Sequence, residues 1–218
     1  MSRLETTVAV IVVVFLVQQT LAVAVYVAFC HRQAEDQGDW FPPALVVLSL
    51  RGPDDRLAEC LRALFQQDYP SFVVCVAVDH PSDPAADVVG AVLEEGDYSH
   101  VQVLHLESPL DRCSLKCSAL RQATADLPVD CEIVAFLNAD VVPRRDWLRR
   151  LARHLISPRV GAAMGNRWYL PPGKHWGSLV RFAWNATSIV TMNFWQVPWG
   201  GSLAVKASVL RETDLRER

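Results

Sequence analysis

The chain has 218 residues, a formal net charge of −3 and 51% hydrophobic residues. This hydrophobic content is high for a soluble domain, and it is concentrated in a few segments, which favours a membrane-associated protein. We expect no nucleic-acid partner.

The first segment, residues 6–30, contains no charged residue. It is long enough to cross about 30 Å of hydrocarbon as a helix. A cleavable signal peptide is the competing interpretation, but the apolar run is too long and no clear small-x-small cleavage site follows it. We therefore expect a single uncleaved transmembrane helix, with a polar linker at residues 31–43.

Charges near this segment nearly balance, with Arg3 before it and His31 and Arg32 after it, so they indicate orientation only weakly. The cysteines are more informative because they show no compact secreted spacing, and Cys60 and Cys75 fall at apolar positions. Buried free thiols suit a reducing compartment. We expect the domain that follows the helix to face the cytoplasm.

Apolar runs and amphipathic patterns alternate from residue 44 onward. The runs are rich in Val, Ile and Leu without polar alternation, as in parallel strands buried on both faces. We expect one α/β domain over residues 44–218, in which ligands bind beyond the carboxyl ends of the strands. The expected strands are 44–50, 71–79, 100–106, 131–138 and 160–168, and the expected helices are 53–68, 84–96, 114–126 and 145–156. We expect Asp54 to act as the N-cap of the first of these helices.

The last third of the chain is rich in tryptophan. Five of the seven tryptophans lie between Trp168 and Trp199, together with the cationic Lys174, His175 and Arg181. These aromatic side chains could pack in a core. They could also lie at a membrane interface, where indole rings occupy the headgroup level. Both interpretations stay open.

Two of the expected strands end in features that suit a ligand. The first is followed by Gly52 and Pro53, which force a turn whose backbone could contact a planar base. The second ends at Asp79, whose carboxylate could accept hydrogen bonds from a ribose or a base. Asp83, directly before Pro84, is better explained as the cap of the next helix.

A lysine opens the helix expected at residues 114–126. Lys116 lies in its first turn, where the helix dipole disfavours a cation unless an anion such as a diphosphate shares the site. Cys113 and Cys117 form a CxxxC pair, which is weak evidence for a metal without further ligands.

The stretch FLNADVVP, residues 136–143, places Asn138 and Asp140 just beyond a buried strand. Asp140 is suited to Mg²⁺ or Mn²⁺, which prefer oxygen ligands and bridge to substrate phosphates, and Asn138 offers a neutral oxygen. These residues, with Asp79 and Lys116, describe a nucleotide-diphosphate site. No GxGxxG or GxxxxGK[ST] motif supports a dinucleotide or P-loop fold.

Several segments together resemble the family 2-type glycosyltransferases with a GT-A fold, particularly their ceramide glucosyltransferase-like branch. The segments are LRGPDDRLAECLRALFQQDYPSFVVCVAVDHPSDPAADVV, LKCSAL, NADVVPRRDWLRRL in the slot of the Asp-x-Asp motif, and WGGSLAVKASVL. The resemblance covers roughly residues 44–210. It implies transfer of a sugar from a nucleotide sugar, a UDP-sugar in this branch, to a lipid hydroxyl at the membrane.

The resemblance also implies site roles. Asp79 would contact the uridine, Lys116 the diphosphate, and Asp140 the divalent metal, Mg²⁺ or Mn²⁺, with Asn138 beside it. Leu50 and Arg51 would line the base pocket, and Gly200, Gly201 and Ser202 would border the acceptor side.

Two departures from the family pattern qualify these expectations. Asn138 stands where the family usually has an acidic residue, which implies a weaker grip on the metal. The family's catalytic base belongs to a later motif than the final RETDLRER, and neither Glu212 nor Asp214 is a suitable substitute, so no catalytic residue is assigned. The covered part resembles the donor-binding half of the enzyme. We expect the domain at 44–218 to be incomplete in its C-terminal part. A catalytically impaired or truncated nucleotide-sugar-binding module and a polysaccharide synthase relative are the alternatives.

Overall fold

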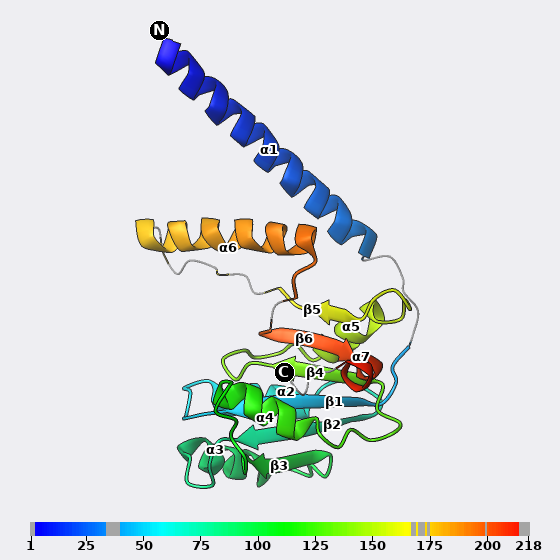
Figure 1. Cartoon of the computed structure of the whole chain (residues 1–218). Coiled ribbons are helices and arrows are strands. Elements are labelled where there is room, and N and C mark those ends of the chain that lie inside the picture. Colours follow the sequence, from blue (N-terminus) through cyan, green and yellow to red (C-terminus); the bar gives the residue numbers. More distant parts are fainter. Residues whose placement is uncertain are drawn as a thin grey trace. The chain divides into compact units, whose positions relative to one another are not determined.

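The computed structural model of the chain describes residues 3–33, 40–166, 169, 173, 175–198 and 200–213. Residues 34–39 of the expected linker, Trp168, Lys174, Trp199 and Asp214 lie outside the described residues. The chain forms two compact units, shown in Figure 1: residues 1–37 with 167–197, and residues 38–166 with 198–218.

The second unit is built on one six-stranded sheet with the order β3-β2-β1-β4-β6-β5. Strands β1 to β4 run parallel, whereas β6 is antiparallel to β4 and β5 is antiparallel to β6. The prediction of an α/β domain with a mostly parallel sheet is confirmed. The strands are β1 (Ala44–Leu50), β2 (Phe72–Val78), β3 (Val101–His105), β4 (Ile133–Leu137), β5 (Ala162–Met164) and β6 (Ser202–Lys206), and the helices are α2 (Leu57–Phe65), α3 (Pro84–Leu93), α4 (Leu115–Ala123), α5 (Trp147–His154) and α7 (Ala207–Glu212).

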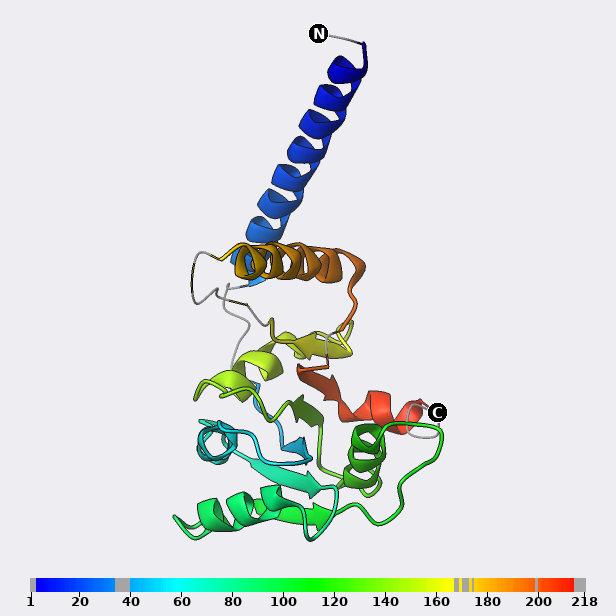
Figure 2. The ribbon, with the colours of Figure 1, turned by 90° about the vertical axis from the view of Figure 1, so that its left-hand side faces the viewer.

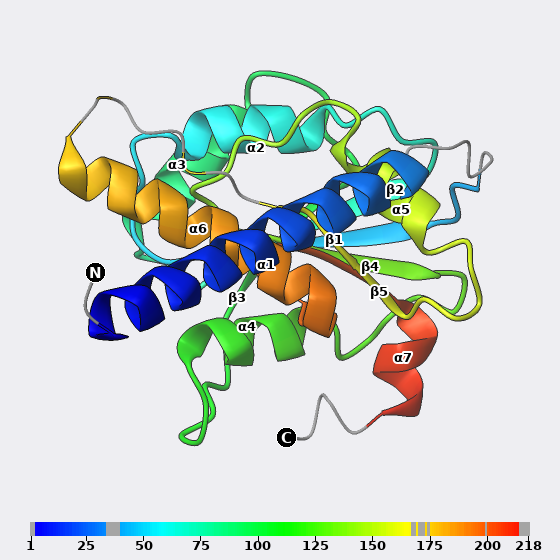
Figure 3. The same cartoon turned by 90° about the horizontal axis from the view of Figure 1, so that it is seen from above.

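The central strands are buried on both faces, which explains their largely apolar sequences. On one face, side chains such as Val46, Leu48 and Val76 pack against α2, α3 and α5. On the other face, Val47 and Val134 pack with side chains of α4 and α7. Figures 2 and 3 show these two helical layers on opposite sides of the sheet.

Side chains cap α3 and α4 in this unit, whereas α2, α5 and α7 begin without a side-chain cap hydrogen bond. Asp83 accepts a hydrogen bond from the amide of Ala85 at 2.8 Å, with Pro84 at the first helical position of α3, so its predicted capping role is confirmed. The prediction that Asp54 caps α2 is wrong. Its carboxylate accepts from the amide of Arg56 in a local turn, and α2 begins only at Leu57.

Buried thiols occur where the sequence analysis expected them. Cys60 and Cys75 are buried and free, and so is Cys131. Burial raises the pKa of the Cys60 thiol to about 12 and that of the Cys75 thiol to about 11, because desolvation disfavours the thiolate. These cysteines therefore act as small apolar core residues.

The described part of the first unit contains α1 (Arg3–Gln33) and α6 (Trp176–Trp195), which contact each other. Over Arg3–Ala28, α1 is long and apolar enough to cross a membrane, and it is the single described helix of which this is true. Its length of 31 residues corresponds to about 46 Å of helix. The sequence patterns did not predict the helix α6.

Candidate functional site

The strand order creates a switch point between β1 and β4. The chain proceeds from β1 outward to β2 and β3, then returns so that β4 lies on the other side of β1. Crevices for ligands form at the carboxyl edge of such switch points, because neighbouring connections leave in opposite directions. The residues that follow β1, β2 and β4 therefore meet at one edge of the sheet.

Strand β6 brings a glycine-rich turn to this same edge. Because β6 is antiparallel to β4, Ser202 at its start pairs with Leu137 at the end of β4. The amide of Asn138 donates to the carbonyl of Gly201 at 3.1 Å. Gly200 and Gly201 are thus direct neighbours of the segment that contains Asn138 and Asp140, although they lie more than sixty residues later in the chain.

Asp79, which follows β2, has a carboxylate that is only 10% exposed. Neither of its oxygens accepts a hydrogen bond within the described residues. The nearest cation is Arg51, whose Nε lies 3.7 Å from Oδ2, beyond hydrogen-bonding distance. Burial raises the pKa of Asp79, while the charge of Arg51 lowers it and that of Asp83 raises it slightly further. A buried carboxylate that accepts no hydrogen bond from the protein is suited to accept one from an N–H or O–H group of a ligand.

The turn after β1 is fixed to the start of α3. Gly52 has φ +71°, a left-handed conformation that favours glycine. Its amide donates to both carboxylate oxygens of Asp83 at 3.0 Å. Asp83 therefore caps α3 and also holds the backbone that follows Leu50 and Arg51. The sequence predicted the cap but not this second contact.

Lys116 and Asn138 form a direct pair. The ammonium Nζ donates to Oδ1 of Asn138 at 2.6 Å, across 22 residues of sequence. Ser114 caps α4 by accepting from the amide of Cys117, which places Lys116 in the first turn of the helix. Because an amide is neutral, the positive charge of Lys116 is oriented without being neutralised, and it remains available to an anion.

A hollow of about 380 Å³ lies beside this pair. It is lined by residues of α4, β4, the glycine turn and β6, namely Lys116, Leu120, Phe136, Asn138, Gly200, Gly201 and Leu203. The sequence analysis anticipated the polar and glycine members. It missed Leu120, Phe136 and Leu203, because their apolar side chains resemble core positions and carry no other signal.

Asp140 lies in the exposed turn after β4. The described residues contain no group of three or more His, Cys, Asp or Glu side chains that could hold a metal by themselves. Cys113 and Cys117 are no exception, and the Cys113 sulfur lies 3.3 Å from the Ser118 hydroxyl. A single carboxylate with a neighbouring amide oxygen still fits Mg²⁺ or Mn²⁺, which are commonly held by one or two carboxylates and substrate phosphates.

Ser202 has a packing partner in the interior. Its hydroxyl accepts a hydrogen bond from the indole N–H of Trp147 at 2.8 Å, which connects β6 to α5. Gly165 approaches it closely, since a Cβ at that position would lie 2.6 Å from the Ser202 oxygen. The serine is thereby held in one place at the start of β6.

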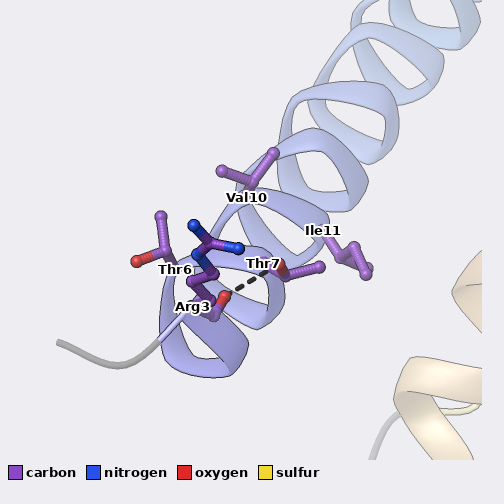
Figure 4. A pocket seen from close by; sticks show the side chains of 5 residues that line it. All are labelled: Arg3, Thr6, Thr7, Val10 and Ile11. Atoms are coloured by element: carbon purple, nitrogen blue, oxygen red, sulfur yellow. Dashed lines mark hydrogen bonds between the residues drawn. The ribbon is translucent and has the colours of Figure 1, made fainter.

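A second hollow, of about 460 Å³, lies on α1. Figure 4 shows its lining, formed by Arg3, Thr6, Thr7, Val10 and Ile11 from one stretch of the helix. The Thr7 hydroxyl donates to the Arg3 carbonyl of the same helix. Because a single exposed helix supplies all these side chains, we regard this hollow as a feature of the helix surface.

The family model of Glycosyl transferase family 2 matches residues 46–212. No curated protein matches the chain in sequence at a significant level. Solved structures do match in fold. The mannosyltransferase PcManGT from Pyrobaculum calidifontis, in complex with GDP-Man and Mn²⁺, has 21% identity and a TM-score of 0.60, with 92% of this chain and 56% of that chain covered.

Glucosyl-3-phosphoglycerate synthase from Mycobacterium tuberculosis, in complex with Mn²⁺, UDP and glucosyl-3-phosphoglycerate, has 15% identity and a TM-score of 0.52. The match covers 78% of this chain and 58% of that chain. The chain therefore spans between half and two thirds of the length of these structures. At these identities the similarity concerns the fold, and the expected GT-A fold is confirmed.

Proposed function

The chain belongs to glycosyl transferase family 2, and from this membership we propose that its sheet edge binds the nucleoside diphosphate of a nucleotide sugar for transfer of the sugar to a hydroxyl acceptor. The proposed nucleotide-binding residues are Leu50, Arg51, Asp79, Lys116 and Asn138. Asp140 is the proposed metal ligand, and Gly200, Gly201 and Ser202 are proposed to border the acceptor side.

The observation that carries this proposal is the separation of two unlike binding groups along one edge. Asp79 follows β2 and has a buried carboxylate to which no described residue donates a hydrogen bond, and an exposed ammonium, Lys116, is held at the end of β4. Strand β1 lies between these two strands, so their ends are two inter-strand spacings apart, about 10 Å. That spacing suits a ligand with an N–H at one end and a diphosphate at the other.

We propose UDP as the nucleotide. Uracil has a single N–H group, which can donate a hydrogen bond to the carboxylate of Asp79. Arg51 beside Asp79 would balance the negative charge of that carboxylate. Lys116 would then meet the diphosphate, with its ammonium oriented by Asn138. One structurally similar protein is in complex with GDP-Man and another with UDP, so a comparison of the two nucleotides is a necessary part of the test.

We propose that a divalent metal, Mg²⁺ or Mn²⁺, is held by Asp140 with help from Asn138. When bound, such an ion would stabilise the negative charge of the departing diphosphate. The chain's own residues would bind the nucleoside at Asp79, hold the diphosphate with Lys116, and keep the backbone of the β1 turn in place through Asp83. Both metal-bearing similar structures contain Mn²⁺.

The finer assignment follows the sequence motifs. We propose a relative of the ceramide glucosyltransferase-like branch with a lipid acceptor, anchored by residues 6–30 and connected through residues 31–43 to a GT-A domain at 44–218 on the cytoplasmic side. The support is the length and apolar character of α1 together with the quoted motifs.

A nucleotide-sugar-binding module with impaired transfer is the second candidate. The observation that favours it is the composition of the hollow, since none of the described residues that line it is acidic or a histidine. General base help of the usual size, roughly 10²–10⁴-fold in rate, would then have to come from other residues.

The test uses the full chain in detergent and measures binding of UDP and GDP by calorimetry, with and without Mn²⁺. We expect UDP to bind more tightly than GDP, and Asp140→Asn to remove the enhancement by Mn²⁺. Asp126→Asn is the matched control, because it makes the same chemical change at an exposed position beyond α4. Absence of binding by either nucleotide to folded protein would refute the proposal, and a transfer assay with a radiolabelled UDP-sugar and ceramide would separate the two candidates.

A further inference from the structure

Helix α6 exposes a face of large apolar side chains. Trp176 is 83% exposed, Trp184 is 78% exposed, and Phe194 is 75% exposed. With a rotation of 100° per residue, these three lie on one side of the helix together with Val180, which is also exposed. A soluble protein rarely presents such a continuous aromatic face without a partner.

The same face carries hydroxyl groups that need no external partner. The hydroxyls of Thr187 and Thr191 donate to the carbonyls of Ala183 and Thr187, and that of Ser188 donates to Trp184. Each therefore satisfies its own donor within the helix. A helix that contacts lipid has to satisfy its polar groups internally in this way, because hydrocarbon offers no hydrogen bonds.

Charge on α6 is nearly absent. Its 20 residues include no acidic side chain and one cation, Arg181. The guanidinium of Arg181 lies 4.2 Å from the ring centroid of Tyr169, which follows β5 in the chain. Asn185, one turn further along, accepts from the amide of Tyr169 at 3.0 Å. Arg181 and Asn185 are thus both engaged with Tyr169, while the aromatic face carries no charge.

We propose that α6 lies in the lipid–water interface of a membrane, with Trp176, Val180, Trp184 and Phe194 in contact with lipid. This inference rests on the proposed membrane anchoring by α1, which belongs to the same compact unit and contacts α6. A helix beside a membrane-spanning segment is held near the bilayer, and Trp is the side chain most enriched at the headgroup level. The polar residues Arg181 and Asn185 favour an interfacial helix over a spanning one.

The three tryptophans of α6 allow the orientation of the helix to be measured. Trp176 and Trp184 are separated by about 12 Å along the axis, and Trp184 and Trp195 by about 16 Å. A helix in the interface keeps all three at the same shallow depth. A helix that crosses the bilayer places Trp184 near its centre and the other two near its surfaces.

The experiment reconstitutes the full chain in phosphatidylcholine vesicles whose acyl chains carry bromine either near the headgroup or near the terminal methyl group. Trp176→Phe, Trp184→Phe and Trp195→Phe are each compared with wild type, and Trp40→Phe is the control because Trp40 packs against the core of the other unit. We expect each α6 substitution to remove a share of the quenching by shallow bromine and little of the quenching by deep bromine, whereas Trp40→Phe changes neither.

Two outcomes would overturn the inference. If deep bromine quenches Trp184 while shallow bromine quenches Trp176 and Trp195, α6 crosses the bilayer. If bromine at neither depth quenches the three tryptophans, protein covers the face, and chemical crosslinking would show whether a second copy of the chain does so. Co-sedimentation of the chain with the vesicles after an alkaline wash reports on α1 separately, so failure of the anchoring proposal is distinguishable from failure of this one.

Discussion

Replacing Asn138 with aspartate should exchange a lysine-based diphosphate site for a metal-based one. In the structure the Lys116 ammonium lies 2.6 Å from Oδ1 of Asn138, a neutral atom. A carboxylate at the same distance would attract the ammonium by about 1.6 kcal/mol in a solvent with the dielectric constant of water. Solvent screening of the exposed lysine lowers the measurable part to about 1 kcal/mol. Since 1.4 kcal/mol corresponds to a tenfold change, metal-free UDP should bind roughly fivefold to tenfold more weakly.

The metal-bound site should change in the opposite direction. Aspartate at 138 would add a second carboxylate beside Asp140, and hard cations bind more tightly as ligand charge increases. Titration calorimetry of UDP, with Mn²⁺ varied, should therefore show weaker binding without metal and half-maximal enhancement at a lower Mn²⁺ concentration. Electron paramagnetic resonance of free Mn²⁺ gives the metal affinity independently of the nucleotide.

Two further variants test whether Asn138→Asp weakens UDP binding through Lys116. Lys116→Met should weaken metal-free UDP binding by itself, and adding Asn138→Asp to it should cause little additional loss, because the two substitutions act through one contact. The reasoning would be wrong if Asn138→Asp left both metal-free binding and the Mn²⁺ requirement unchanged, or if its effect were the same with methionine at position 116.

Three other predictions concern stability. Burial raises the pKa of Asp79, so its ionised form destabilises the native state at neutral pH, and stability from this group increases as the pH falls through the raised pKa. Asp79→Asn should remove that pH dependence and keep the melting temperature at neutral pH at or above that of wild type. The same variant should bind UDP more than tenfold more weakly. A lower melting temperature together with unchanged UDP binding would contradict the proposed role of Asp79. Asp83→Ala should lower the free energy of unfolding in urea by about 1–2 kcal/mol, because α3 loses its cap and Gly52 its acceptor, and Asp83→Asn should lose less. Gly165→Ala should destabilise by about 1–3 kcal/mol through its contact with the Ser202 hydroxyl, with partial recovery on adding Ser202→Ala; an unchanged urea midpoint would refute the clash.

The amino-acid sequence determined the elements whose signals are local. Apolar runs rich in Val, Ile and Leu marked β1, β2 and β4 to within two residues, because strands buried on both faces tolerate few polar side chains. Asp83 before Pro84 marked the start of α3, since an N-cap and a proline at the first position act within a few residues. The N-cap predicted at Asp54 was wrong because an aspartate side chain can either cap a helix or close a turn. Here Asp54 closes a turn.

Only the tertiary structure decided how distant residues meet. The carboxylate of Asp79 is buried, and no described residue donates to it, because of its place at the sheet edge. The neighbouring sequence does not predict this burial. The contact between Lys116 and Asn138 depends on the placement of α4 against the end of β4, and the approach of Gly201 depends on β6 pairing antiparallel to β4. The type of each residue indicated what its side chain could bind. Strand order and register decided which side chains share a site. Packing of the whole sheet, rather than neighbouring residues, sets the order and register of the strands.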